Sequence, residues 1–416
     1  MRSKIFTLSL MVMLSLNGFA VGVATDRAWY LAGEVMRVNV ATDHASIVYA
    51  ELCDTYGLAA GVVISIVEGE GTGTMQLPAD LHSGYYVLSV FTRDNAQVSH
   101  QLVAVVNPLR KSVDDDIEWV ADDSCRVTGK GVADLVSEKG IDVPETDGHI
   151  IKARMRNDHD GQMMNDTQIR PSLSIVGKQI HYFEGKMVND STAVFNTYGV
   201  HGKLPLVLSA QSSTGVSLPI EMISPFATLL PKRLPHLVFH YRRAEVEARS
   251  LDMQRHQMAI APAKRELQLG SMDDDTAVDG VPLDYDDTLF GNKPDITYNL
   301  DEYRQFLTIR EALTEYVTSV VRKKVNGVTR LSILKEQERY QSSLPTLVLI
   351  DGMPVTDTEQ LLNYDARRLH YINIYDSQYK FGYGMYDGII SFVTRSGRLT
   401  NYPIERNAQY LVYEFP

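Results

Sequence analysis

The stretch from Thr346 to Gly397 limits most strongly what this chain can fold into. Leu347 to Ile350 is continuously apolar, which is typical of a strand buried on both faces. Asp351-Gly352 follows as a pair that accepts the positive φ angles of a tight turn. Asp357 to Leu362 then offers an N-cap and an apolar pair for a short helix. Two more β-rich runs follow across a Gly- and Tyr-rich loop, so the pattern predicts a small α+β domain.

The amino-acid sequence of this stretch resembles that of the plug domain of TonB-dependent outer-membrane receptors. The matching segments are LVLIDGMPV at 347–355, LHYINIYD at 369–376 and DGIISFVTRSG at 387–397. In the last of them, Asp387-Gly388 is expected to turn the chain into the closing strand. The loop from Ser377 to Met385 departs from the family because it is bulkier and more aromatic. Since no barrel sequence follows Gly397, the transport activity of the family is not carried over.

The same domain extends upstream to about Leu300. Thr308 to Glu311 reads as a capping box at the start of a helix. Val320 to Val325 and Val328 to Leu334 flank Asn326-Gly327, which predicts a hairpin with a two-residue turn. We therefore expect a plug-like domain at 300–400 and a C-terminal tail at 401–416.

The N-terminus carries a leader pattern. Arg2 and Lys4 precede an apolar run from Ile5 to Leu16 that is short for a membrane span. We expect a signal peptide at 1–24, cleaved after Ala20 or Ala24, and no transmembrane segment after cleavage. The formal net charge is −12, and losing the two basic residues of the leader makes it more negative. Phosphate binding needs clustered Lys and Arg, so we expect no nucleic-acid partner.

Residues 25–107 carry about six short strand patterns at regular spacing, which predict a β-sandwich. Turns are expected at Glu70 to Gly73 and at His82 to Gly84. The opening segment resembles the MG2-type macroglobulin domain, which begins with the pattern D-x-x-x-Y-x-x-G-E. The residues that match this pattern are Asp26, Tyr30, Gly33 and Glu34. The sequence has no CGEQ thioester motif, so the covalent trapping by α2-macroglobulins is not implied.

Residues 108–235 predict a second β-sandwich, which resembles transthyretin-like and carboxypeptidase-regulatory domains. Asp114 to Asp116 and Asn157 to Gly161 are polar runs that favour solvated turns over calcium binding, because the spacing does not fit a calcium loop. Residues 236–299 predict a linker with a helical pattern at Ala244 to Met258. Its Asp-rich stretch, Ser271 to Asp287, is expected to be exposed and to be cut first by proteases.

Little in the sequence points to catalysis. Cys53 and Cys125 lie in different predicted domains, so both a disulfide and two buried thiols stay open. His236 and His240 are four positions apart, but their segment is expected to be partly extended, which does not favour metal coordination. The sequence contains no zinc-spaced ligand set, nucleophile turn or phosphate loop. We therefore expect a non-enzyme with no catalytic, cofactor or metal site.

The fold prediction is a mainly β, multidomain chain with two β-sandwich domains followed by a small α+β plug-like domain. Its expected function is that of an exported, modular binding or scaffold protein, periplasmic or associated with the outer membrane, that acts through protein–protein contacts. An accessory role in an outer-membrane TonB-dependent transport system, with a separately encoded barrel, is the alternative. A third possibility is the N-terminal part of a longer ancestral protein.

The candidate partner-binding residues lie in the aromatic loop of the terminal domain. Aromatic rings are enriched in the centres of interfaces, and Gly382 and Gly384 are expected to let the loop adapt its backbone. The competing interpretation is that these aromatic rings simply cover the sheet. The binding hypothesis predicts that substitution of Phe381 and Tyr383 by Ala abolishes partner capture without loss of stability. The four candidates are Tyr379, Phe381, Tyr383 and Tyr386.

Overall fold

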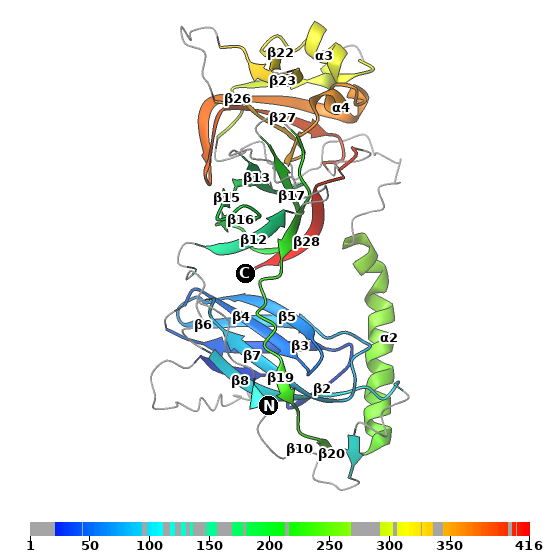
Figure 1. Cartoon of the computed structure of the whole chain (residues 1–416). Helices are drawn as coiled ribbons and strands as arrows, with labels where there is room; N and C mark the ends of the chain where they lie inside the picture. The colour runs from blue at the N-terminus through cyan, green and yellow to red at the C-terminus, as the bar shows by residue number, and fades with distance from the viewer. Residues whose placement is uncertain are drawn as a thin grey trace, which may run out of the picture. The chain divides into compact units, whose positions relative to one another are not determined.

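A computed structural model describes most of the chain. The described residues are 21–43, 45–93, 98–110, 117–120, 126–129, 134–135, 145, 148–155, 169–177, 180–212, 216–267, 292–302, 306–325, 327–335, 344–397, 402–404 and 406–416. Residues 1–20 of the expected signal peptide, Cys125, the two polar runs and the Asp-rich stretch lie outside them. Internal contacts divide the chain into two units, one with residues up to 148 and 226–264, the other with 149–225 and 265–415 (Figure 1). This division differs from the expected boundaries.

The first unit is built around a two-layer β-sandwich. Its three-stranded sheet has the order β1-β3-β6, and its five-stranded sheet has the order β2-β8-β7-β4-β5. Side chains from the facing sides of the two sheets form one apolar core, as alternation along the strands predicts. The strands are β1 Gly22–Thr25, β2 Trp29–Leu31, β3 Val35–Ala41, β4 Ile47–Cys53, β5 Leu58–Ser65, β6 Glu70–Gln76, β7 Gly84–Phe91 and β8 Val98–Val106.

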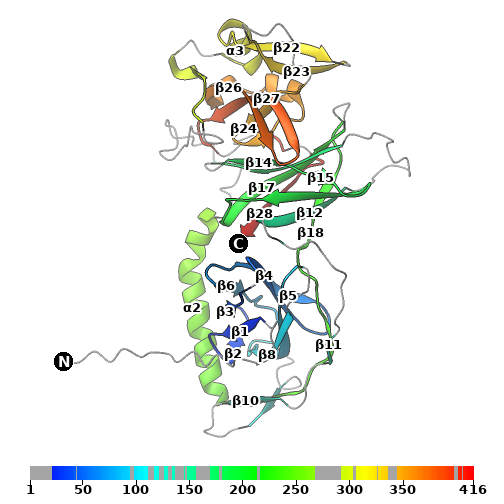
Figure 2. The same cartoon turned by 90° about the vertical axis from the view of Figure 1, so that its left-hand side faces the viewer.

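The outer face of the five-stranded sheet is also covered. Every residue of β4 is buried, because segments predicted to belong elsewhere pack on the second face of this sheet. Phe226 and Leu229 pack with Tyr49, while Phe239 and Val246 pack with Trp29. The elements that pack there are β9 Ile117–Trp119, β20 Leu237–His240 and the start of α2 Arg243–Leu267, the long helix in Figure 2. The remaining strands of this unit are β10 Arg126–Gly129, which pairs with β20, and the pair β11 Asp134–Leu135 and β19 Pro231–Arg233. The expected linker at 236–299 therefore begins as ordered structure.

The macroglobulin-like pattern spans two short connections, from β1 to β2 and from β2 to β3, and its side chains bond across both. The Tyr30 hydroxyl donates to Asp26 Oδ1 at 2.5 Å, and the Leu31 N–H donates to Glu34 Oε2 at 2.9 Å. Gly33 has a φ of 88°, which favours glycine. From α2, the Arg249 guanidinium donates to both carboxylate oxygens of Glu34 at 3.0 and 2.8 Å. The spacing of this pattern is thus explained by hydrogen bonds on either side of strand β2.

One expectation for this unit is corrected, and the structure bears on another. The turn predicted at Glu70 to Gly73 is strand β6, and the turn itself is formed by Glu68-Gly69, both with positive φ. The glycines of β6 serve close packing, since a Cβ on Gly73 would lie 2.6 Å from a side-chain carbon of Ile64. At the start of the chain, Gly22–Thr25 is strand β1 and pairs with β3. Cleavage after Ala20 keeps this strand, whereas cleavage after Ala24 would remove most of it.

The second unit contains another two-layer sandwich. Its sheets have the orders β15-β16-β12-β18 and β14-β13-β17-β28, with one apolar core between them. The predicted C-terminal tail is wrong, because its last residues form β28, which pairs antiparallel with β17 along seven positions. The strands are β12 His149–Met155, β13 Arg170–Ile175, β14 His181–Glu184, β15 Lys186–Met187, β16 Thr192–Thr197, β17 Gly202–Gln211, β18 Ile220–Ile223 and β28 Gln409–Phe415.

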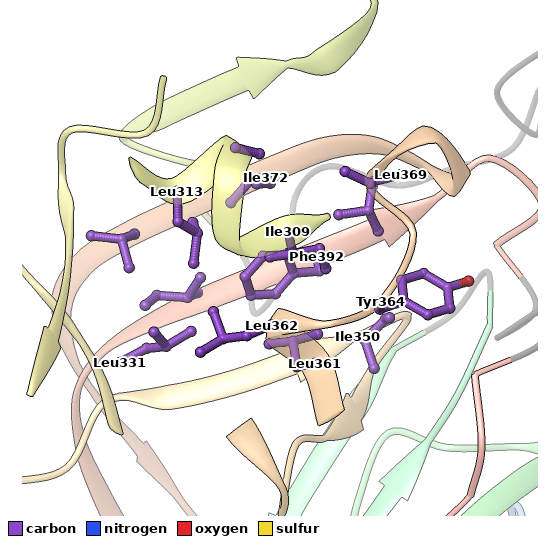
Figure 3. Packing of buried hydrophobic residues seen from close by; sticks show 14 of the residues in the cluster. Ile309, Leu313, Leu331, Ile350, Leu361, Leu362, Tyr364, Leu369, Ile372 and Phe392 are labelled. Atoms are coloured by element: carbon purple, nitrogen blue, oxygen red, sulfur yellow. The ribbon is translucent and has the colours of Figure 1, made fainter. Parts of the chain in front are cut away.

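The terminal α+β fold of this unit is a mixed sheet in the order β21-β26-β27-β24-β25, covered on one face by two helices and a hairpin. Figure 3 shows Leu361 and Leu362 of α4, Ile309 and Leu313 of α3, and Leu331 of β23 gathered around Phe392. The elements are β21 Ile296–Asn299, η2 Leu300–Glu302, α3 Ile309–Glu315, β22 Val320–Val325, β23 Val328–Ile333, β24 Leu347–Ile350, β25 Met353–Pro354, α4 Thr358–Leu362, η3 Ala366–Arg368, β26 Leu369–Phe381 and β27 Gly384–Thr394.

The structure confirms the helix N-caps and the hairpin that the sequence predicted in this domain. Thr308 accepts a hydrogen bond from the Glu311 N–H as the N-cap of α3, and Asp357 caps α4 in the same way. The predicted hairpin is β22–β23. The turn expected at Asp387-Gly388 is wrong, since both residues lie inside β27. The partner strand β26 has a register irregularity between Tyr375 and Gln378.

Candidate functional site

The predicted aromatic loop is in fact the end of a long hairpin. Strands β26 and β27 pair as far as Phe381 and Gly384, which leaves only Gly382-Tyr383 as the turn. This end of the hairpin contacts β14 of the second sandwich, as Figure 1 shows for the orange strands beside the green ones. A backbone bridge joins Glu184 to Gly382, and the Tyr383 N–H donates to the Glu184 carbonyl at 3.1 Å. We call this contact the hairpin junction.

The apolar part of the hairpin junction is an aromatic cluster. The Tyr182 ring meets Phe381 edge-on at 5.7 Å between ring centroids and Tyr386 at 5.8 Å. Phe381 and Tyr386 are buried, with 7% and 4% of their surface exposed. Tyr379 is partly buried and stacks on Phe381 at 5.9 Å. Two of the four predicted binding residues therefore pack inside the molecule, and Tyr379 lies at the edge of the same cluster.

The polar part of the hairpin junction is centred on Glu184. Arg170 Nε and Nη2 donate to the two carboxylate oxygens of Glu184 at 3.2 and 2.8 Å. The Tyr386 hydroxyl donates to the same carboxylate, and it lies 2.8 Å from the Tyr182 hydroxyl. The guanidinium of Arg170 also lies over the Tyr386 ring, 4.9 Å from its centroid. A paired, multiply hydrogen-bonded charge of this kind tolerates partial burial.

Burial sets the protonation of these groups. It raises the pKa of the Tyr386 hydroxyl well above its usual value and the pKa of Tyr182 to about 12. For Arg170, burial lowers the pKa, but the hydrogen bond to Glu184 and the charge interactions with Tyr386, Glu184 and Tyr182 together outweigh it, and the net pKa is raised. Both hydroxyls therefore remain protonated at neutral pH and can donate. This hydrogen-bonded cluster therefore joins the second sandwich to the terminal α+β fold of the same unit.

The two glycines have a different role from the expected one. A Cβ on Gly382 would lie 2.4 Å from the backbone oxygen of Glu184, and one on Gly384 would lie 2.3 Å from its carboxylate. Gly382 also has a φ of 59°. Both positions thus need glycine for close approach, and the expectation of an adaptable loop is corrected. The turn is fixed against β14.

Tyr383 is the predicted residue that faces outward. Its side chain is 52% exposed, and the neighbouring Met385 is 48% exposed. The Lys186 ammonium lies 5.8 Å from the centre of the Tyr383 ring. Among the four candidates, Tyr383 is therefore the one whose ring is most open to a partner.

A second link joins the terminal sheet to the sandwich. Asp351, at the predicted tight turn, has a φ of 46°, and its buried carboxylate accepts hydrogen bonds from Thr394 N–H and Oγ1 at 2.8 and 2.5 Å. The Asp351 carbonyl accepts from the Gly177 N–H of the sandwich at 3.0 Å. The LVLIDG and TRSG segments, far apart in sequence, therefore meet at one buried carboxylate.

Sequence reasoning missed Arg170, Tyr182 and Glu184. They lie about 200 positions from Tyr386, and the short strand β14, which carries Tyr182 and Glu184, was not predicted. Within the described residues, no three His, Cys, Asp or Glu side chains gather as ligands of a metal ion. Cys53 is fully buried. The helices of the described part include none that is long and apolar enough to cross a membrane.

No protein-family model and no curated protein matches the chain. Among solved structures, native α2-macroglobulin of Escherichia coli matches at 13% identity over 51% of this chain and 15% of its own, with a TM-score of 0.19. Salmonella α2-macroglobulin reacted with methylamine matches at 13% over 53% and 15%, with a TM-score of 0.19. The BSP domain of a biofilm-associated protein matches at 12% over 50% and 29%, with a TM-score of 0.18. The chain thus spans a minor part of each, and such TM-scores define no common overall fold.

Proposed function

We propose that this chain is an exported, non-enzymatic binding or scaffold protein of the cell envelope that acts through protein–protein contacts. In this proposal the leader directs export to the periplasm or the outer membrane. The macroglobulin-like first sandwich and the plug-like terminal domain serve as recognition modules. The partner is a protein, with an outer-membrane protein as the first candidate.

The observation that carries the proposal is the half-exposed Tyr383 ring on a fixed turn. Its neighbours Gly382 and Gly384 lie against Glu184, and the Tyr383 backbone is hydrogen-bonded to Glu184. An aromatic residue on a preorganised backbone loses little conformational entropy on binding. Tyrosine is also enriched among the residues that dominate binding free energy at interfaces. Tyr383, together with Met385, is therefore the proposed contact for a partner.

A photo-crosslinking amino acid at position 383 tests this proposal in intact cells. We expect it to capture a defined envelope protein, and we expect Tyr383→Ala to reduce that capture without changing the thermal midpoint. Tyr56 provides a matched control because it is 88% exposed and lies in the first unit. Equal capture from positions 56 and 383, or unchanged capture by the Tyr383→Ala variant, would contradict the proposal.

The alternative function is an accessory role in an outer-membrane TonB-dependent transport system. It is favoured by the mixed terminal sheet, in which β24 lies parallel to β27 and Asp351 binds Thr394. These are the segments whose amino-acid sequences resemble those of receptor plugs. The same crosslinking experiment separates the two functions, because identification of a TonB-dependent barrel protein as the captured partner would support the transport role.

A further inference from the structure

The hairpin β22–β23 concentrates positive charge in an acidic chain. Its sequence from Val320 to Ile333 contains four basic residues and no Asp or Glu, whereas the whole chain has a formal net charge of −12. The basic residues are Arg322, Lys323, Lys324 and Arg330. Such a local reversal of charge creates a field that attracts acidic groups.

The hairpin also presents a free strand edge. Strands β22 and β23 form a separate two-stranded sheet, and in the described part of the chain β22 pairs with β23 alone. Val320 and Leu331 are buried in the terminal core and fix the base of the hairpin. Beyond this base, the four residues from Arg322 to Val325 are exposed. The edge of β22 therefore has backbone groups that another strand can pair with.

Charge and apolar surface alternate along the outer face of the hairpin. The strand register places Val321, Lys323 and Val325 on the same face, opposite Ser332, Arg330 and Val328. Val325 and Val328 are 41% and 37% exposed. An added strand would match this face if it placed an acidic residue beside Lys323 and aliphatic residues two positions before and after it, because every second side chain of a strand lies on the same face.

The basic side chains of β22 are only lightly used by the fold. Arg322 donates to the uncharged Thr314 hydroxyl at 3.0 Å. Glu359 has a charge interaction with Lys324, but its carboxylate already accepts hydrogen bonds from Thr329 and Arg310. Within the described residues, neither Arg322 nor Lys323 nor Lys324 forms an ion pair with a carboxylate.

We propose that β22 is a docking edge for an acidic, extended segment of a partner protein, which adds to the hairpin as a third strand. Backbone hydrogen bonds to β22 supply affinity, and the alternating charges set the register. The observations favour a protein segment over a membrane surface, because the hairpin carries no aromatic residue and its exposed large apolar side chains are only the valines Val325 and Val328. This surface is distinct from Tyr383 at the hairpin junction.

A synthetic peptide built on Val-Glu-Glu-Glu-Val tests the proposal on the purified mature protein, because as a strand it offers Glu to Lys323 on one face and to Lys324 on the other. We expect saturable binding by calorimetry, with amide shifts confined to the β22–β23 hairpin in NMR spectra. The K323E/K324E double variant is expected to weaken binding by about tenfold, because two attractive pairs become repulsive. K380E is the matched control, as Lys380 is an exposed strand lysine of the same domain, and it is expected to leave affinity within about twofold.

Three results would overturn the proposal. The first is absence of peptide binding, which would mean that the lysines only protect the edge against aggregation. The second is equal binding of a backbone N-methylated peptide, which would show charge attraction without strand addition. The third is binding of phosphatidylglycerol vesicles, sensitive to K323E/K324E, with no binding of the peptide. Thermal midpoints of the charge variants and of K323Q/K324Q show whether each variant is folded.

Discussion

At the scale of single residues, the hairpin junction depends on Glu184. This carboxylate joins Arg170 from β13 to Tyr386 from β27, so it links two strand systems through one side chain. A buried donor or acceptor that loses its partner costs more free energy than the hydrogen bond itself contributes. The junction is therefore expected to respond strongly to small changes.

Tyr386→Phe removes one hydroxyl from this network and leaves the ring in place. We expect the free energy of unfolding of the second unit to fall by about 1–3 kcal/mol, because the buried Tyr182 and Glu184 oxygens lose a partner. Urea denaturation followed by Tyr fluorescence measures this change. Tyr383→Phe is the control, and its half-exposed hydroxyl is expected to contribute less than about 0.5 kcal/mol. Equal denaturation midpoints for the two variants would show that the Tyr386 hydroxyl does not stabilise the hairpin junction.

Gly382→Ala tests the close approach of the turn to β14. The added Cβ meets the Glu184 backbone at 2.4 Å, and the φ of 59° disfavours any side chain. We expect a loss of about 1–3 kcal/mol in the free energy of unfolding. Gly57→Ala is a suitable comparison, since its Cβ would meet no atom within 4 Å. If thermal unfolding shows the same midpoint for both alanines, the turn is adaptable after all.

At the scale of elements, β28 completes the second sandwich. Phe415 is 2% exposed in its core, and the Tyr413 hydroxyl lies 2.6 Å from His149 Nε2. The strand also satisfies the backbone of β17, which would otherwise be an open edge. An element that the sequence placed in a tail thus contributes to the core.

Truncation after residue 408 removes β28. Loss of one buried Phe alone costs about 3–5 kcal/mol, a large share of the stability of a typical domain. We expect amide hydrogen exchange in β17 to accelerate by orders of magnitude, as measured by mass spectrometry. Exchange in β3 of the first unit is the internal control. Unchanged protection of β17 would show that β28 is dispensable.

A second prediction at this scale concerns the residue at which the mature protein, and with it the first sandwich, begins. Val21 is buried, and β1 pairs with β3. Cleavage after Ala20 preserves both features, so we expect the mature protein to begin at Val21. N-terminal sequencing of the exported protein checks this. A chain that begins at Thr25 would lack β1, and one that begins at Met1 would rule out cleavage.

At the scale of the whole molecule, the chain up to residue 415 crosses three times between its two units, after residues 148, 225 and 264. The segment 149–225 leaves the first unit and 226–264 returns to it. The terminal α+β fold and the second sandwich belong to the same unit, joined by β28 and the hairpin junction. Sequence order and spatial grouping therefore differ.

Limited proteolysis tests this grouping. We expect the first cut between Gly270 and Asn292, as the Asp-rich composition predicts, but the cut fragments should stay together. The fragment that begins near residue 292 still pairs with β17 through β28 and packs on β14. Size-exclusion chromatography should show one nicked species in buffer and two fragments in denaturing urea. Separation of the fragments in buffer would show that the terminal domain is independent.

Local signals in the sequence predicted much of the secondary structure. Strand alternation at β3, the N-caps Thr308 and Asp357, and the two-residue hairpin β22–β23 depend on neighbours in the chain, and the structure confirms each. The Asp351-Gly352 turn is equally local, since both residues have positive φ. These features follow from propensities and backbone geometry that a short window contains.

Only the tertiary structure decided what each element packs against. Glycines read as turn or loop residues at Gly73 and Gly382 are instead sites of close approach, and the atoms they approach belong to other strands. The rings of Phe381 and Tyr386 are buried because β14, some 200 positions earlier, lies on them. Burial depends on surfaces brought together by the whole fold, and no single segment encodes its partner. The sequence therefore determined those strands, caps and turns that depend on chain neighbours, whereas the fold determined that Tyr383 is the candidate ring most open to a partner.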